Sequence, residues 1–356
     1  MNLLFIFTGG TIGSTVSGDY ITTDENKPYE LLEAYRNKYG FEHTYNAITP
    51  YTELSEQNTG VTISKLIRCV CDAVSGSYDG IIITHGTDTL PYSAAALSYA
   101  LGNDCIPVCF VSSNYPITDK RANGVDNLYG AIKLIEDAIS FRGVFVSYRN
   151  HDGIIYIHRA SRLLETQAFS DEYYSANGMY YGKITKGAFI KNPDYTEKED
   201  GMNPLGCVEL PDVCEGIKRY HLFPGIKLDN MDDNSEQVSQ DNGHNNSEGE
   251  MPSDNMPRYI LLESYHSGTM NTKLPAYRNF FEKMYEQGIT VFLCGVTDGI
   301  TYESTSVYGE LHIQSIYGLS PVAAYMKLWM IMSAGYKVRA DELMCPLGGD
   351  RDNTGR

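Results

Sequence analysis

Positive charge is scarce in this chain, and long apolar runs are missing. Lys and Arg number 28 against 45 Asp and Glu, so the formal net charge of the 356 residues is −17. A nucleic-acid-binding surface needs clustered Lys and Arg to neutralise phosphates, and docking on anionic lipid needs a basic patch. No apolar stretch approaches the roughly 18 residues that a membrane-spanning helix requires. The composition therefore predicts neither a nucleic-acid nor a membrane partner.

The sequence also lacks a secretory signal pattern and a zinc-type cysteine pattern. The apolar run 3–7 has no basic segment before it and leads directly into Thr8-Gly9-Gly10. The eight cysteines include no Cys-x-x-Cys pair, and none stands near a histidine at zinc-finger spacing. Several lie inside apolar runs, where a free thiol behaves as a small hydrophobic group. These features predict a cytoplasmic protein with reduced cysteines.

Short apolar runs alternate with segments of helical periodicity over the first part of the chain. Four continuous runs are typical of strands buried on both faces: 3–7, 80–84, 106–111 and 143–147. Between them lie three segments with helical spacing or composition: 63–74, 92–101 after Pro91, and 128–139. This alternation predicts an α/β fold with a doubly wound parallel sheet. The runs 154–157 and 183–190 are predicted as hairpin strands at its edge.

The domain organisation follows from shifts in composition. We expect an N-terminal catalytic domain over 1–190, a polar and acidic linker over 191–257, a smaller C-terminal α/β domain over 258–345, and a tail over 346–356. Within the linker, 229–257 holds eight acidic residues and no Lys or Arg. Such a segment cannot bury enough apolar surface to offset its ordering entropy, which predicts disorder.

Two loops of similar design follow two of the predicted strands. Thr8-Gly9-Gly10-Thr11-Ile12 follows the run 3–7, and His85-Gly86-Thr87-Asp88-Thr89 follows 80–84. Ligands bind outside the carboxyl ends of parallel strands, where these loops would face one another. A Thr hydroxyl is a weak nucleophile unless its proton is removed, and the facing loop offers a second Thr and an Asp for that purpose. The pair predicts acyl transfer at an amide carbonyl, although either loop alone is also typical of an ordinary strand end.

Together the two loops resemble the signature motifs of the bacterial-type L-asparaginase family. Ala122-Asn123-Gly124 and Gly318-Leu319-Ser320-Pro321 add weaker matches, and the resemblance is strong over about residues 3–150. It implies an amidohydrolase that converts L-asparagine to L-aspartate and ammonia through a threonine acyl-enzyme. It implies no metal and no organic cofactor, a small amino-acid amide as substrate, and a homodimer or homotetramer.

The resemblance also implies roles for single residues in the reaction. Thr11 matches the nucleophile, and Thr87 matches the second catalytic threonine. Asp88 matches the carboxylate that meets the substrate ammonium group. Tyr20, in a mobile Gly-rich lid over 14–22, matches the tyrosine that closes over the substrate.

Further residues are expected to bind the substrate. Ser55 and Glu56 resemble the pair that grips the α-carboxylate and the α-amine, because a zwitterion needs both donors and anionic partners. Gly10 and Gly86 allow backbone N–H groups to approach the ligand and offer an oxyanion hole. His85 matches a structural residue of the family rather than a base.

One departure from the family concerns its catalytic lysine, which lies beside the positions of Thr87 and Asp88. The matching stretch 159–169 has no Lys, and Arg162 is the best substitute. A guanidinium keeps its proton, so Arg162 would orient Thr87 and Asp88 while another group acts as base. Two alternatives stay open: an enzyme or ammonia-supplying amidotransferase component acting on another small amide, and a non-catalytic amino-acid-binding relative.

Overall fold

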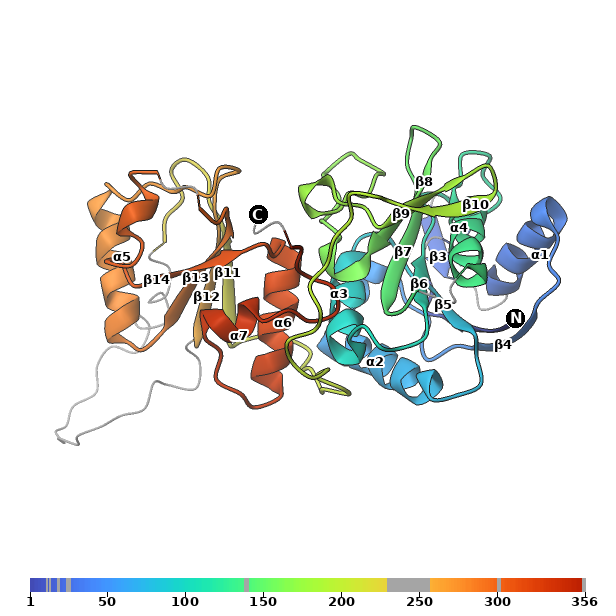
Figure 1. Cartoon of the computed structure of the whole chain (residues 1–356), viewed down its shortest axis with the longest axis horizontal. Coiled ribbons are helices and arrows are strands. Elements are labelled where there is room, and N and C mark those ends of the chain that lie inside the picture. The colour runs from blue at the N-terminus through green and yellow to red at the C-terminus, as the bar shows by residue number, and fades with distance from the viewer. Residues whose placement is uncertain are drawn as a thin grey trace. The chain divides into compact units, whose positions relative to one another are not determined.

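Figure 1 shows a computed structural model of the chain, which describes residues 1–10, 12, 14–17, 20–23, 27–137, 141–228, 257–299 and 302–353. The chain forms two compact units. The first comprises Met1–Val213 and Leu319–Arg356, and the second comprises Cys214–Gly318. Each unit is built on its own sheet with helices, so the predicted α/β class with a larger and a smaller sheet is confirmed.

The first unit contains an eight-stranded sheet in the order β10-β9-β8-β7-β6-β5-β1-β4. Five neighbouring strands are parallel: β4 (Thr44–Ile48), β1 (Asn2–Phe7), β5 (Gly80–Thr84), β6 (Val108–Val111) and β7 (Val144–Arg149). Three antiparallel strands continue the sheet from β7: β8 (Ile155–Arg159), β9 (Gly182–Thr185) and β10 (Ala188–Lys191). The hairpin strands predicted at the sheet edge are therefore present.

Between β1 and β7 the chain forms the α-helices α1 (Lys27–Tyr39), α2 (Gly60–Val74), α3 (Leu90–Leu101) and α4 (Gly124–Glu136). Pro91 stands in the first turn of α3, where its missing N–H costs nothing. Every described residue of β1 except Asn2 is buried, and all of β5 is buried, as strands covered on both faces require.

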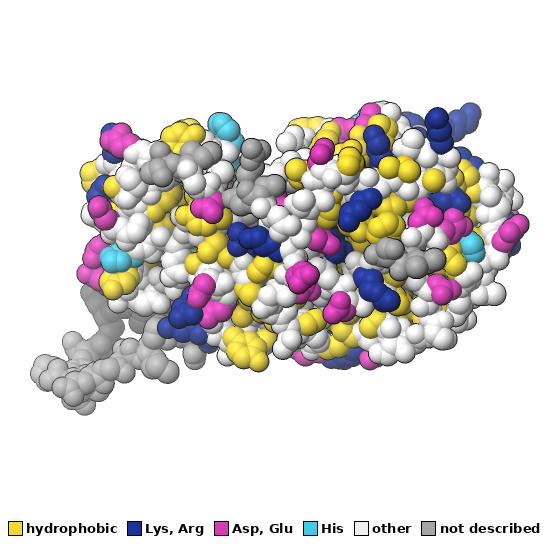
Figure 2. All heavy atoms as spheres, viewed as in Figure 1, with side chains coloured by type: hydrophobic (Ala, Val, Ile, Leu, Met, Phe, Trp, Pro, Cys, Tyr) yellow, Lys and Arg dark blue, Asp and Glu magenta, His cyan; other side chains and the backbone are white. Residues whose placement is uncertain are grey.

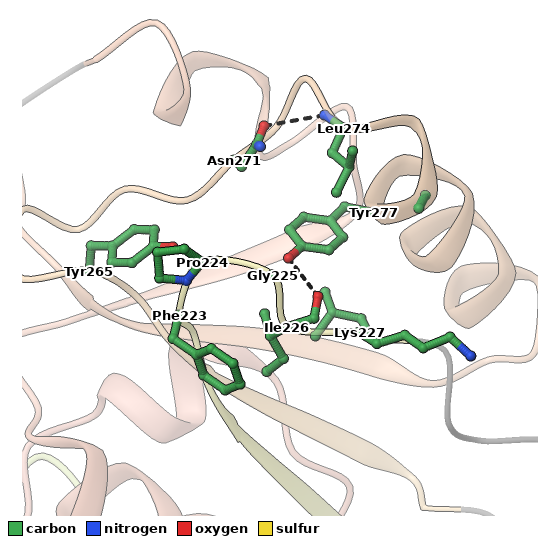
Figure 3. A pocket seen from close by; sticks show the side chains of 11 residues that line it. Phe223, Pro224, Gly225, Ile226, Lys227, Tyr265, Asn271, Leu274 and Tyr277 are labelled. Carbon is green, nitrogen blue, oxygen red and sulfur yellow. Dashed lines mark hydrogen bonds between the residues drawn. The ribbon is translucent and has the colours of Figure 1, made fainter.

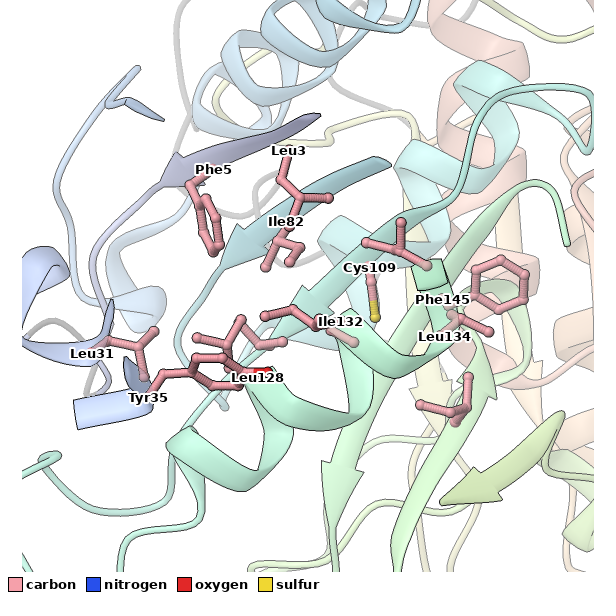
Figure 4. Close-up of a cluster of buried hydrophobic side chains, with 14 of the residues drawn as sticks. Leu3, Phe5, Leu31, Tyr35, Ile82, Cys109, Leu128, Ile132, Leu134 and Phe145 are labelled. Carbon is pink, nitrogen blue, oxygen red and sulfur yellow. The ribbon is translucent and has the colours of Figure 1, made fainter. Parts of the chain in front are cut away.

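One core cluster joins the strands to α4 and α1 (Figure 4). The cluster takes side chains from several strands, among them Leu3, Phe5, Ile82, Cys109 and Phe145. They pack against Leu128, Ile132 and Leu134 of α4 and against Leu31 and Tyr35 of α1. Apolar residues at helical spacing on α4 thus meet the continuous apolar runs of the strands, which fixes the helix on this face.

Strand β4 and helix α1 have no counterpart in the sequence analysis. Strand β4 is an edge strand whose residues alternate between exposed and half-buried, so it lacks a continuous apolar run. Helix α1 carries a weak apolar stripe among many charged and polar residues. Both elements acquire their partners only through the fold, β4 by pairing with β1 and α1 by packing on α4.

The second unit contains a four-stranded parallel sheet in the order β11-β12-β13-β14. Its elements are β11 (Ile217–His221), β12 (Tyr259–Glu263), α5 (Pro275–Glu286), β13 (Thr290–Val296) and β14 (Ile313–Tyr317). In the sequence, the segments 258–263 and 289–294 indicate strands, and 275–287 and 321–334 indicate helices, which match β12, β13, α5 and α6 (Pro321–Ser333). Strands β11 and β14 were not predicted, because polar residues interrupt both short segments. The acidic segment 229–256 lies outside the described residues, so its predicted disorder stays a prediction.

The C-terminal residues differ most from the predicted domain ranges. Helices α6 (Pro321–Ser333) and α7 (Ala340–Met344) belong to the first unit, and α6 packs against α3. Both α3 and α6 are buried almost all round, so each needs an apolar partner rather than solvent. Residues 347–350, expected to form a tail, are buried in the same unit.

A buried ion pair joins helix α6 to the residues near the C-terminus. The Lys327 ammonium of α6 lies 2.7 Å from an Asp350 carboxylate oxygen, and both side chains have no exposed surface. Lys327 also donates to the Cys345 carbonyl oxygen at 2.5 Å, and Asp350 accepts from the Leu347 N–H at 3.1 Å. Each charge therefore has further hydrogen-bond partners, as a buried pair requires.

Replacing one partner of this pair should destabilise the fold strongly. We expect Lys327→Met to lower the free energy of unfolding by about 3–5 kcal/mol, because it leaves the Asp350 carboxylate buried without its cation. Urea denaturation measures the change. Arg68→Met is the control, because the Arg68–Glu209 pair is more than half exposed and should contribute less than about 1 kcal/mol. Equal losses in the two variants would refute the structural role of Lys327.

Candidate active site

The two glycine-containing loops leave the sheet side by side. Strands β1 and β5 are adjacent and parallel, with Phe7 paired to Thr84, so the loops start at the same sheet edge. The Thr8 hydroxyl donates to the Thr84 carbonyl oxygen at 2.7 Å and ties the two strand ends together. The prediction that the loops face one another at the carboxyl ends of the strands is confirmed.

The loops touch through backbone atoms at Gly10 and Gly86. A Cβ atom on Gly10 would lie 2.3 Å from the Gly86 nitrogen and 2.5 Å from its Cα, and Gly10 has φ +77°. A Cβ atom on Gly86 would lie 2.4 Å from the Ser55 hydroxyl oxygen. Neither position has room for a side chain, so these glycines allow three segments to meet within van der Waals contact.

The third segment follows β4 and contains Glu53 and Ser55. The Gly10 N–H donates to the Glu53 carbonyl oxygen at 3.0 Å, and the Glu53 N–H donates to the Thr8 carbonyl oxygen at 3.1 Å. The Gly10 amide is therefore engaged in holding the loops together. The predicted oxyanion hole, if built on glycine amides, would have to rely on Gly86 rather than on Gly10.

Ser55 and Asp88 lie together, as the predicted substrate-binding role requires. Ser55 is buried in a short 3₁₀ turn, Ser55–Gln57. Its hydroxyl oxygen accepts from the Asp88 N–H at 3.2 Å and lies 3.5 Å from an Asp88 carboxylate oxygen. Asp88 and Glu56 both have exposed side chains, and Thr87 is half-buried. The carboxylate side chains of Asp88 and Glu56 are thus accessible, whereas the Ser55 hydroxyl is buried beside Asp88.

His85 is locked in its neutral form under this loop. Burial lowers the pKa of His85 to about 4, although the hydrogen bond with the Gly86 carbonyl oxygen acts in the opposite direction and raises it. Its Nδ1 lies 2.8 Å from that carbonyl oxygen and so carries the proton, which leaves Nε2 to accept from Ser93 at 3.0 Å and Asn58 at 3.2 Å. Both ring nitrogens of His85 are thus engaged in hydrogen bonds that hold the loop in place.

Two side chains near the site gave no signal in the sequence. The Asn58 amide donates to Thr89 Oγ1 at 3.1 Å as well as approaching His85, and so links the Ser55 turn to the start of α3. The Tyr173 hydroxyl donates to the Thr87 carbonyl oxygen at 2.5 Å. Asn58 stands only three residues from Ser55, but Tyr173 is 86 residues from Thr87, a separation that no local pattern bridges.

Arg162 lies in a different environment from the one predicted. Its Nε donates to the Gly349 carbonyl oxygen at 2.8 Å, and a terminal nitrogen donates to the Thr196 carbonyl oxygen at 3.1 Å. The guanidinium also lies over the Tyr195 ring, 4.9 Å from its centroid. Neither Thr87 nor Asp88 is among these partners, so the structure does not support Arg162 as the substitute for the family lysine. It binds the C-terminal segment instead.

The predicted nucleophile and lid are only partly described. Thr11 lies outside the described residues. Tyr20 is the first residue of β3 (Tyr20–Thr23), which pairs antiparallel with β2 (Ser14–Ser17). The described parts of the predicted lid therefore form a two-stranded antiparallel sheet, in which Ser17 pairs with Tyr20.

A separate hollow of about 470 Å³ lies in the second unit (Figure 3). It is lined mainly by apolar and aromatic side chains, including Phe223, Ile226, Tyr265 and Tyr277. The Tyr277 hydroxyl donates to the Ile226 carbonyl oxygen at 2.8 Å, across the hollow wall. This lining contains no Asp or Glu.

Two searches of the described residues bear on cofactors and membranes. Within them, no group of three or more His, Cys, Asp or Glu side chains could hold a metal ion. The described helices also include none that is both long and apolar enough to cross a bilayer.

Comparison with known proteins places this site in a family. The family model "Asparaginase, N-terminal" matches residues 2–194, more than half of the chain. The chain therefore belongs to the asparaginase family, whose members are amidohydrolases.

Curated relatives fall into two groups. A glutamyl-tRNA(Gln) amidotransferase subunit from Methanobrevibacter smithii is 27% identical over 246 residues, which are 64% of this chain and 54% of that protein. The L-asparaginase of Thermococcus kodakarensis is 34% identical over 150 residues, which are 42% of this chain and 44% of that protein. The matched parts thus span only about half of each relative.

Solved structures share the fold along nearly the whole chain. The thermostable L-asparaginase from Thermococcus kodakarensis has a TM-score of 0.73 at 20% identity, with 97% of this chain and 96% of that chain covered. L-asparaginase I from Vibrio cholerae has a TM-score of 0.69 at 20% identity, with 96% and 95% covered. At this identity the likeness concerns the fold.

The glycine contact between the loops should be sensitive to a single methyl group. We expect Gly10→Ala to lower the free energy of unfolding by about 1–3 kcal/mol more than Gly40→Ala, because only Gly10 faces the backbone of another loop. Gly40 has nearly the same φ, +76°, with nothing within 4 Å, so both variants share the same backbone strain. Chemical denaturation of the two variants gives the comparison, and equal losses would contradict the close packing.

Because two histidines are buried, we expect the free energy of unfolding to fall in acid. Burial lowers the pKa of His158 to about 3, as it lowers that of His85 to about 4. Between pH 6.5 and these values the unfolded chain binds protons that the folded chain does not. The free energy of unfolding should therefore be highest above pH 6.5 and fall by about 1.4 kcal/mol per pH unit for each histidine below it.

Denaturation curves between pH 7.5 and 4.5 test this expectation. His158→Gln should make the decline shallower by the share of one histidine, whereas His221→Gln, at a side chain that is 73% exposed, should leave the slope unchanged. Identical slopes for His158→Gln and the unmodified protein would show that His158 is not a buried neutral group.

Proposed function

We propose that this protein hydrolyses the side-chain amide of L-asparagine, or of a closely related small amino-acid amide, to the acid and ammonia. The observation that carries the proposal is the convergence of the Thr8–Gly10 and Gly86–Asp88 loops, with Ser55 bound to Asp88. Membership of the asparaginase family supports the reaction class. The choice of asparagine rests on the resemblance of the motifs and on relatives that are named L-asparaginases.

The proposed mechanism is a two-step acyl transfer on Thr11. The Thr11 hydroxyl attacks the amide carbonyl and the C–N bond breaks. The leaving nitrogen takes the hydroxyl proton and departs as ammonia, and an ester links the acyl group to Thr11. Water then attacks the ester and releases the acid. Tyr20 is assigned to the lid over the substrate, and Thr87 with Asp88 is assigned to polarising the attacking groups.

Substrate recognition is assigned to the accessible groups around Ser55. The carboxylates of Asp88 and Glu56 would pair with the substrate ammonium group, and the Ser55 turn would supply donors to its carboxylate. Ser55 fits this task because the same hydroxyl already fixes the Asp88 backbone. Arg162 has no part in this scheme, since its guanidinium binds Gly349 and Thr196.

A second candidate function is supply of ammonia within an amidotransferase. Several relatives are named as subunits of a glutamyl-tRNA(Gln) amidotransferase, which favours this reading. The charge of the chain opposes a role on tRNA, because −17 overall repels phosphates. On the face shown in Figure 2, Lys and Arg side chains lie among Asp and Glu side chains rather than in a basic tract of their own.

We also propose a cytoplasmic location and a homo-oligomeric state. The location is supported by the free cysteines and by structural similarity to a protein titled probable cytoplasmic L-asparaginase from Campylobacter jejuni. A homodimer or homotetramer is expected from the family resemblance, and light scattering coupled to size exclusion measures it directly.

Removing the proposed nucleophile tests the mechanism. We expect Thr11→Ala to lower ammonia release from asparagine by more than about 1,000-fold, because the acyl-enzyme can no longer form. Hydroxylamine added to the unmodified enzyme should yield the hydroxamate by trapping that intermediate. Thr44→Ala, at an exposed threonine of β4, is the matched control and should retain full activity.

The same assay separates the alternatives. Turnover of glutamine in preference to asparagine would favour the amidotransferase-type function. A thermal shift with asparagine but no ammonia release would indicate a binding protein. Full activity in Thr11→Ala would eliminate Thr11 as the nucleophile.

A further inference from the structure

Tyr173 connects a distant part of the first unit to the Thr87–Asp88 pair. The residue is buried, with 1% of its surface exposed, in the segment between β8 and β9. Its hydroxyl donates to the Thr87 carbonyl oxygen at 2.5 Å. A fully buried tyrosine normally gives its hydroxyl a partner, but here the partner is the backbone between two proposed site residues.

The surroundings of Tyr173 fix its position. The Asn150 side chain, at the end of β7, donates from Nδ2 to the Tyr173 carbonyl oxygen at 2.9 Å and accepts the Tyr173 N–H on Oδ1 at 3.1 Å. The Tyr173 ring packs edge to face on Tyr148, with 4.7 Å between centroids and an interplanar angle of 89°. Backbone and ring are therefore both held, and the hydroxyl has a defined direction.

The peptide group between Thr87 and Asp88 is held at both of its polar atoms. Tyr173 binds its carbonyl oxygen, and the Ser55 hydroxyl accepts its N–H at 3.2 Å. Because a peptide group is planar and trans, its C=O and N–H point in opposite directions. Two partners on opposite sides therefore prevent the plane from rotating, and that rotation would redirect the side chains of Thr87 and Asp88.

The Tyr173 hydroxyl also stays protonated, as a donor must. Burial, with smaller contributions from Tyr148 and Asp88, raises the pKa of Tyr173 well above its usual value. The hydrogen bond to Thr87 is therefore available across the pH range in which the fold persists.

We propose that Tyr173 is a positioning residue that fixes the Thr87–Asp88 peptide in the orientation required for turnover. The expected effect of Tyr173 on kcat rests on the proposed amide hydrolysis, whereas its expected effect on the mobility of the Thr87–Asp88 peptide does not. Without the Tyr173 hydroxyl, the peptide keeps its bond to Ser55 and can pivot about it. The Thr87 end then moves more than the Asp88 end, so turnover should suffer more than substrate binding.

The kinetic test compares two conservative substitutions in the same aromatic pair. Tyr173→Phe keeps the ring and removes the bond to Thr87, and we expect kcat to fall at least about tenfold with KM within about threefold. Tyr148→Phe removes a neighbouring buried hydroxyl that interacts with Asn123 instead, and both constants should stay within about threefold. A kcat for Tyr173→Phe within twofold of the unmodified enzyme would overturn the proposal.

A second measurement does not depend on catalysis. Amide hydrogen exchange followed by mass spectrometry should show peptides covering 85–89 exchanging at least about fivefold faster in Tyr173→Phe than in Tyr148→Phe, while peptides from β5 exchange equally. Unchanged exchange over 85–89 would refute the positioning role, and so would a parallel rise in β5, which indicates global destabilisation. If the unmodified protein releases no ammonia, the proposed function fails and exchange alone decides about Tyr173.

Discussion

The backbone contact between Gly10 and Gly86 is the constraint on which the site depends. Strands β1 and β5 are neighbours in one parallel sheet, so their following loops must share the space above one sheet edge. They can do so only because neither glycine carries a Cβ atom, which would lie 2.3–2.4 Å from backbone or from Ser55. Once the loops touch, the Ser55 turn after β4 closes on both, and groups from three strand ends meet.

The scaffold under the accessible carboxylates is made of neutral hydrogen-bonding groups. His85 is kept uncharged by burial, and Ser55 and Tyr173 bind the two ends of one peptide group. The side chain of Asp88 is exposed and therefore accessible to a ligand. Neutral supports suit the amino-acid substrate that we propose, because a buried fixed cation nearby would compete with its ammonium group for Asp88.

Two of the buried cations of the first unit, Arg162 and Lys327, bind groups of its C-terminal segment. Arg159 pairs with Glu197, Arg162 binds carbonyl oxygens at 349 and 196, and Lys327 pairs with Asp350. The bonds of Arg162 and Lys327 anchor the last part of the chain and help to explain why 319–353 belongs with the first unit. The Arg162 guanidinium is thus engaged with carbonyl oxygens of Gly349 and Thr196, and neither Thr87 nor Asp88 is among these partners.

The amino-acid sequence alone determined the elements that a short stretch of residues is enough to indicate. Continuous apolar runs indicated β1, β5, β6 and β7, helical periodicity indicated α2 and α4, and the two glycine loops followed from their place after strands. Which segments cover or pair with one another was decided only in the tertiary structure. Strands β4, β11 and β14 depend on pairing, α6 depends on α3 for its cover, and the partners of Arg162 and Tyr173 lie 187 and 86 residues away. The physical reason is that periodicity records which face of an element is buried, whereas the identity of the group that covers it is fixed only when distant segments pack together.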